Sequence, residues 1–232
     1  MILIRSLPGI FLLTFSLTSC QAVRSSQRAV EVPEHVLIEA MQVKADATPL
    51  EKLNANAIEQ TTQTKSYDPS YVKLDYPNGD VPINTGVCAD VVVRAFRKAG
   101  IDLQKELHED MKGNFAKYPQ KWGARKPDAN IDHRRVPNLM TWFDRQGKAR
   151  PITKDAKDYL PGDVVSWELD NGLAHVGMVS KIKVEGTDRH AVAHNIGLGA
   201  RIEDVLFAWK ITGHYRYFEQ KQNTTGKARP GR

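Results

Sequence analysis

One cysteine and several histidines of this chain could work together as a nucleophile and its base. The chain has two cysteines, Cys20 and Cys88, and seven histidines. A cysteine nucleophile needs an imidazole that takes its proton, and the imidazole needs a partner that orients it. Cys88 stands at the beginning of a predicted helix, where free N–H groups and the helix dipole lower a thiol pKa. We therefore expect a reactive Cys88, with a buried, inert cysteine as the alternative.

The best candidates for the base are His175 and His194. Each falls on a predicted strand, and neighbouring antiparallel strands bring side chains of one face within reach of each other. Considered singly, either would be a structural histidine. A solitary thiol at a helix start, followed by histidines on consecutive strands, favours a nucleophilic site.

The elements that must position these groups can be predicted from residue spacing. A helix is expected from Cys88 (CADVVVRAFRKAG), with apolar residues at helical intervals and Gly100 at its end. A second helix is expected over Val136–Gln146. Strands are expected at turns and alternating apolar runs, over Asp163–Leu169, Ala174–Val184, His190–Ile196 and Ile211–Phe218. Helices followed by an antiparallel meander predict an α+β fold.

At this point the sequence resembles the NlpC/P60 superfamily of papain-like cysteine peptidases. The motifs are the Cys88 helix, residues 160–165 (LPGDVV) and residues 175–179 (HVGMV). More narrowly, residues 71–218 are similar to the DUF1287 family. Its hallmarks appear as residues 76–80 (YPNGD), 130–139 (NIDHRRVPNL) and 194–197 (HNIG).

The resemblance implies a role for each candidate residue. Cys88 would be the nucleophile, His175 the general base and acid, and His194 the group that orients His175. Tyr76 would help to bind the oxyanion. Asn195 could replace His194 as the third group, because adjacent strand residues point to opposite faces. The chain departs from the superfamily's usual Asp-Cys-Ser-Gly, since residues 87–90 are VCAD.

Polar residues before the second helix are candidates for binding substrate. Arg134, Arg135 and Asn138 could line a cleft and hold substrate carboxylates through bidentate bonds. The alternative is a structural ion-pair cluster with Asp132. One cysteine and two histidines offer too few ligands for a closed zinc site, and the chain has no CxxC or HExxH pair, so no metal or cofactor is expected.

The N-terminus predicts export. Arg5 precedes a short apolar run at residues 10–17, far below the ~20 residues that span a bilayer. Residues 17–20 (LTSC) resemble a bacterial lipobox, which implies that Cys20 is lipidated, and Gln21 resembles an outer-membrane address. The alternative is a plain secretory signal. The expected location is the periplasm of a Gram-negative bacterium, with a lipid anchor in the outer membrane.

The composition of the other segments predicts the domain boundaries and the class of binding partner. We predict a signal at residues 1–20, a flexible tether at 21–66, a globular domain at 67–218 and a disordered basic tail at 219–232. The net charge of +6 has no long basic run interleaved with aromatics, so nucleic acid is not an expected partner. The expected function is an envelope cysteine amidase or peptidase that cleaves peptidoglycan stem peptides. The alternatives are an inactive peptidoglycan-binding module and an acyltransferase of the same superfamily.

Overall fold

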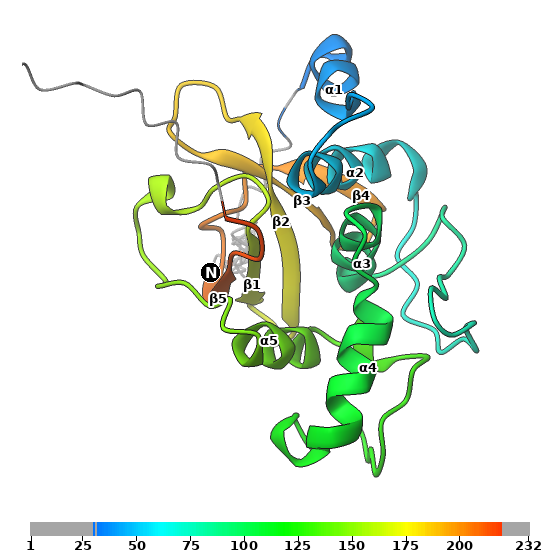
Figure 1. The fold of residues 1–232 in the computed structure, drawn as a ribbon. Helices are drawn as coiled ribbons and strands as arrows, with labels where there is room; N and C mark the ends of the chain where they lie inside the picture. The colour runs from blue at the N-terminus through cyan, green and yellow to red at the C-terminus, as the bar shows by residue number, and fades with distance from the viewer. Residues whose placement is uncertain (1–29, 31, 220–232) are drawn as a thin grey trace, which may run out of the picture.

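The described part of the chain is a mixed α+β structure built on one antiparallel sheet (Figure 1). The computed structural model describes residue 30 and residues 32–219, so Cys20 and the predicted signal and basic tail lie outside it, except for Glu219. The sheet has five strands in the order β4-β3-β2-β1-β5. They are β1 (Val164–Glu168), β2 (Ala174–Lys183), β3 (His190–Asn195), β4 (Ala200–Glu203) and β5 (Lys210–Tyr215). The helices are α1 (Glu34–Met41), α2 (Pro49–Gln63), α3 (Cys88–Lys98), α4 (Leu103–Asn114) and α5 (Val136–Arg145).

The helix that carries the cysteine forms as the sequence predicts. α3 begins at Cys88 and ends at Lys98, and Gly100 follows with a φ of +90°. Glycine adopts that conformation without the steric cost that a side chain adds. Phe96 and Val92 of α3 are fully buried, so this helix packs over its length against the sheet and the other helices.

The sheet has one face covered by helices and another covered by loops. Val176 and Met178 of β2 belong to a core shared with α2, α3 and α5, which lie beside the sheet in Figure 1. The opposite face carries Trp167 and Val179, which pack with Trp209 and other residues of the β4–β5 connection. Two apolar layers therefore sandwich β2, and its alternating side chains enter one or the other.

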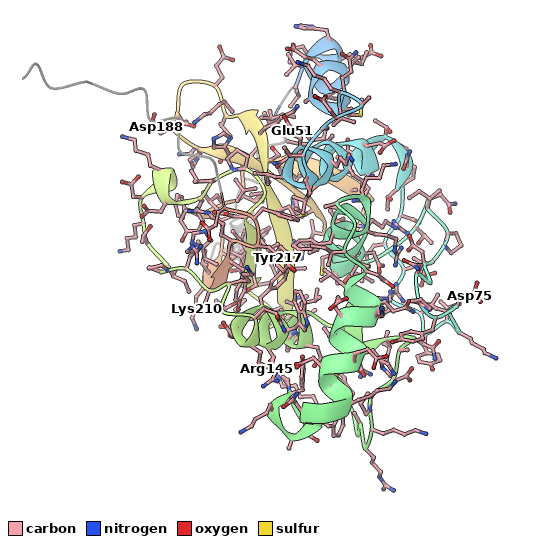
Figure 2. All side chains as sticks on the ribbon, viewed as in Figure 1. Glu51, Asp75, Arg145, Asp188, Lys210 and Tyr217 are labelled. Atoms are coloured by element: carbon pink, nitrogen blue, oxygen red, sulfur yellow. The ribbon has the colours of Figure 1, made fainter. Side chains whose placement is uncertain are left out.

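Aromatic contacts pack the residues that follow β5 against helices α3 and α5. Tyr217, labelled in the middle of Figure 2, stacks on Trp142 of α5 with ring centroids 5.9 Å apart. Its ring also meets the ring of Phe96 on α3 edge-on at 5.4 Å. Arg145 of α5 pairs with Asp110 of α4 at 2.6 Å. These contacts tie α3, α4 and α5 into one layer.

The predicted flexible tether at residues 21–66 is wrong for its second half. α2 begins at a capping box, in which the Thr48 hydroxyl and the Glu51 carboxylate each accept a backbone N–H from the other residue. Leu53 and Ile58 are then fully buried against the core. The segment's polar composition hid this packing.

A buried polar contact further anchors α2. Gln60 is fully buried, and its Nε2 donates to the backbone carbonyl of Val91 in α3 at 2.9 Å. A long glutamine would normally indicate an exposed helix face. Here it joins α2 to the helix that carries Cys88, so the folded unit begins before residue 67.

Candidate active site

Cys88 is the first residue of α3 and lines a cavity of about 500 Å³. The helix starts here because the Asp90 carboxylate accepts the backbone N–H of Val87 at 2.6 Å. Gly86, just before it, has a φ of +155° and lies against Asp90 so closely that a Cβ would stand 3.0 Å from the carboxylate. The predicted position of the thiol at a helix start is therefore confirmed.

Three polar groups near the sulfur of Cys88 act to lower its pKa. They are the backbone N–H groups of Val176 and Ala89 and the hydroxyl of Tyr67. These donors stabilise a thiolate, but the side chain is fully buried, and burial raises its pKa to about 11. The sequence predicted a lowered thiol pKa from the helix start. That expectation is wrong, because loss of hydration outweighs these three groups.

Three strands hold a line of buried polar side chains, which we call the histidine relay: His175 of β2, His194 of β3 and Glu203 of β4. His175 Nε2 lies 2.9 Å from His194 Nδ1, and His194 Nε2 lies 2.9 Å from Glu203 Oε2. All three residues are less than 5% exposed. The structure thus brings together the two predicted histidines and adds a carboxylate that the sequence did not indicate.

A missing side chain on β2 makes room for the histidine relay. Gly177 pairs with His194 in the β2–β3 register. A Cβ on Gly177 would stand 3.0 Å from the His194 Cβ and 2.8 Å from a Val192 methyl group. Residues two apart on a strand point to the same face, so the His175 side chain lies on the same face of β2 as Gly177. Because Gly177 has no side chain there, the rings of His175 and His194 can meet.

The carboxylate at the end of the relay sets the direction of its hydrogen bond to His194. The bond to His194 lowers the pKa of Glu203, so Glu203 is ionised and can only accept. His194 therefore donates from Nε2 to Glu203, and the direction of the bond between His194 Nδ1 and His175 Nε2 depends on the tautomers of the two rings. Burial, with a smaller contribution from His194, lowers the pKa of His175 to about 3. The His175 ring is therefore neutral near pH 7.

The thiol and the relay lie on opposite faces of β2, near neighbouring residues at the start of the strand. Cys88 packs with Val176 in the helix-side core, whereas the His175 ring lies beside Trp167 and Trp209. The Val176 N–H lowers the pKa of Cys88, so the sulfur lies near the peptide unit that joins His175 to Val176. Nε2 of His175 contacts His194, so Nδ1 is the ring nitrogen outside the relay.

The tyrosine near the thiol is not the one that the resemblance implied. The Tyr76 hydroxyl donates to Glu109 of α4 at 2.5 Å, and its ring packs edge-on against His108. Burial, followed by this hydrogen bond, raises the pKa of Tyr76 to about 12. Tyr67 instead reaches the sulfur, and burial raises its pKa as well. Tyr67 precedes the hallmark motifs and lies in a loop, which gave no sign of its role.

Asn195 has a supporting place outside the relay. Its side-chain amide is fully buried and donates to the carbonyls of Ser66 at 3.1 Å and Gly86 at 3.0 Å. It therefore fastens the chain on either side of the site, namely the segment that carries Tyr67 and the loop before Cys88. Of the two predicted third groups, His194 is the one in contact with His175.

The three predicted substrate-binding residues have different surroundings. Arg134 is buried and bound to Asp90 through Nε at 2.9 Å and Nη2 at 3.0 Å. Its guanidinium also donates to backbone carbonyls at residues 68 and 70, so its role is structural. Asn138 is buried and donates to the backbone of Asp132. Arg135 alone keeps an open guanidinium over the cavity, where it also pairs with Asp132 at 3.0 Å.

Within residues 32–219, no three His, Cys, Asp or Glu side chains are grouped to hold a metal ion. None of the helices there is long and apolar enough to cross a bilayer. The predicted lipidation site, Cys20, lies outside the described residues.

The chain belongs to the family described as "Domain of unknown function (DUF1287)", whose model matches residues 54–217. It is also similar to "Uncharacterized protein YijF" of Escherichia coli (strain K12). The two are 60% identical over 163 residues, which cover 70% of this chain and 78% of that protein. The predicted DUF1287 membership is thereby confirmed. The matched range begins inside α2, in agreement with the packing of that helix, and the likeness to NlpC/P60 peptidases stays a prediction.

Proposed function

We propose that this protein is an NlpC/P60-like cysteine hydrolase that cleaves amide bonds in peptidoglycan peptides. Two observations carry the proposal: a thiol at a helix start whose neighbour on β2 is Val176, and a buried His175–His194–Glu203 relay that begins one residue earlier on the same strand. A nucleophile, a base and an orienting chain are the parts that covalent amide cleavage needs. The cavity beside Cys88 provides the place for a substrate.

Each group has a defined step in the proposed reaction. Cys88 Sγ attacks the carbonyl carbon of the substrate while its proton passes to His175 Nδ1. The C–N bond then breaks, and the imidazolium returns that proton to the leaving amine. Water next attacks the thioester, with His175 Nδ1 taking a proton from the water and returning it to Sγ as the acid leaves. The free enzyme is restored without any other reactant.

In the proposed resting state the thiol and the imidazole are both neutral. Burial raises the pKa of Cys88 and lowers the pKa of His175, so a standing thiolate–imidazolium pair is disfavoured. Proton transfer therefore accompanies the attack. The Tyr67 hydroxyl and the Val176 N–H stabilise the sulfur as negative charge develops on it, and Glu203 stabilises the positive charge carried by the relay.

The proposed place of action is the bacterial envelope. The short apolar run at residues 10–17 and the lipobox-like residues 17–20 support export and lipid attachment at Cys20. A protein tethered to the outer membrane from the periplasmic side faces peptidoglycan, whose peptides present many amide bonds.

Digestion of isolated peptidoglycan by the purified protein, with products identified by mass spectrometry, tests the proposal. Wild-type protein should release new amine and carboxyl ends, and Cys88→Ala should abolish that release. Cys88→Ala must keep the wild-type melting temperature, so that lost activity is not lost folding. Undiminished cleavage by a folded Cys88→Ala variant, or no cleavage by wild-type protein, would overturn the proposal.

A second candidate function is a peptidoglycan-binding module without turnover. The fully buried thiol, whose pKa is raised to about 11, favours it, because an unreactive cysteine needs no activation. The two candidates separate in one experiment. If the protein is a binding module, the wild-type and Cys88→Ala forms should bind muropeptides equally well, and neither form should cleave them.

A further inference from the structure

A second hollow adjoins the cavity at Cys88. The first cavity, of about 500 Å³, is lined in part by Lys121, Trp122 and Arg135, and the second, of about 620 Å³, is lined in part by Arg125, Lys126 and the same Trp122 and Arg135. We call the two hollows together the basic cleft. The shared residues form the ridge between its two parts, with the Arg135 guanidinium 4.4 Å from the Trp122 ring centre.

The ridge residue Arg135 has free hydrogen-bonding capacity. A guanidinium carries five N–H donors, and the hydrogen bonds of Arg135 within the described chain use Nη1, which donates to Asp132. Arg134, its neighbour, differs because Nε, Nη1 and Nη2 all donate to Asp90 or to backbone carbonyls. Arg135 is therefore available to a ligand, and Trp122 holds its plane in place.

The charges of the basic cleft are unbalanced. Lys121, Arg125 and Lys126 are exposed, and none of them forms an ion pair with a carboxylate in the part of the chain that the structure describes. The acidic residue of the second hollow is Asp128. Its carboxylate accepts from the Tyr71 hydroxyl at 3.0 Å and from the Asn130 side chain at 3.0 Å. Lys121, Arg125 and Lys126 thus lack counterions within the described chain, whereas Arg135 pairs with Asp132 through Nη1 alone.

We propose that the basic cleft selects acidic peptides, with Arg135 binding a carboxylate of the substrate while Cys88 faces the amide to be cut. Lys121 supports this anion in the first hollow, and Arg125 and Lys126 bind a further acidic group in the second. A planar guanidinium binds a carboxylate through two parallel bonds, which fixes both position and orientation. The selection of substrate rests on the proposed function, but the binding of acidic peptides can be measured without any cleavage.

Binding to the full chain carrying Cys88→Ala tests the inference by calorimetry. The probes are an acetylated alanine tetrapeptide with a free C-terminal carboxylate and the same peptide with a C-terminal amide. The acid should bind at least about tenfold more tightly than the amide, a difference of about 1.4 kcal/mol. Adding Arg135→Gln should remove this preference, and Arg135→Lys should restore only part of it.

Lys105→Gln is the matched control, because Lys105 is exposed on α4, lines neither hollow, and its loss changes the net charge by the same amount. It should leave the preference intact. Equal binding of acid and amide, no binding of either at millimolar concentration, or an equal loss in Lys105→Gln would overturn the inference. If acidic peptides bind as described but wild-type protein cuts no amide, the basic cleft stands and the proposed hydrolase function fails.

Discussion

Glu203 Oε2 lies 2.9 Å from Nε2 of His194, and both side chains are buried. This contact lies at the outer end of the histidine relay. An ionised carboxylate can only accept a hydrogen bond, so His194 donates to Glu203 from Nε2. A residue that does not touch His175 can thus orient it through His194.

Glu203→Gln should lower kcat for amide cleavage by at least about tenfold with a smaller effect on KM. The amide keeps the size of the side chain but loses the charge that stabilises the relay, and its NH₂ group can reverse the hydrogen bonds. Nitrogen NMR of the histidines should show a changed tautomer at His194. Glu168→Gln is the matched control, because Glu168 is exposed on β1 and pairs with Lys210. Equal kinetics for Glu203→Gln and Glu168→Gln would rule out this role.

Gly177→Ala should damage the relay directly. The new methyl group would press on His194 and Val192 at 2.8–3.0 Å, so we expect about 1–3 kcal/mol of destabilisation and a large loss of cleavage. Urea unfolding and activity measure the two effects. Gly113→Ala on α4 is the control, since a Cβ there meets nothing within 4 Å. A stable and fully active Gly177→Ala protein would show that the relay tolerates displacement or is not used.

The alkylation rate of Cys88 should keep rising with pH well beyond the ordinary thiol pKa of ~8.5, because burial raises the pKa of this thiol to about 11. Tyr67→Phe should move the pH profile still higher, since it removes the hydroxyl that donates to the sulfur. Iodoacetamide labelling followed by mass spectrometry gives the profile. A rate that levels off below pH 8 would show that the resting thiol is already ionised.

The sequence predicted the elements whose apolar residues repeat at one clear period. α3 and α5 lie within a residue of their predicted bounds, and β1, β2 and β3 were predicted to within a residue or two. Strand β4 was not predicted. It has four residues, of which Arg201 alone is exposed, and two glycines lie just before it. Short strands of this kind become strands through pairing with a neighbour, which local sequence does not report.

The chemistry of the site was predictable only where one residue type was rare. A single cysteine in the globular part and histidines on successive strands singled out Cys88, His175 and His194. Glu203 and Tyr67 gave no such signal, because glutamate and tyrosine are common and their roles depend on pairing across the sheet and on loop position. Arg134 likewise looked able to bind substrate until its three nitrogens were seen to be occupied.

Leu53→Ala should destabilise the domain by about 2–5 kcal/mol, because Leu53 is fully buried where α2 meets the core. A flexible tether would predict no effect. Ile38→Ala on α1, where the side chain is 46% exposed, is the control and should cost about 0.5 kcal/mol or less. Urea unfolding of both variants measures the difference. Equal stability of the two variants would mean that α2 does not belong to the folded unit.

The domain should lose stability as the pH falls from 7 to 5, in part through two buried histidines. Burial lowers the pKa of His133 to about 4 and that of His175 to about 3, whereas a histidine of the unfolded chain titrates near 6.5. Below pH 6.5 the unfolded state therefore binds protons that the folded state excludes. The stabilisation is present above pH 6.5 and decreases toward the folded pKa, by about 1.4 kcal/mol per pH unit for each histidine.

His133→Gln isolates one of these contributions. The pH dependence of its unfolding free energy between pH 7 and 5 should be smaller than that of wild-type protein by about 2 kcal/mol, even if the variant is less stable at pH 7. His133 suits this comparison because it lies outside the relay and its Nδ1 has no hydrogen-bond partner in the described structure. His35→Gln, on the exposed side of α1, should leave the wild-type pH dependence unchanged. If the unfolding free energies of His133→Gln and wild-type protein change with pH in parallel, His133 does not contribute to the loss of stability at low pH.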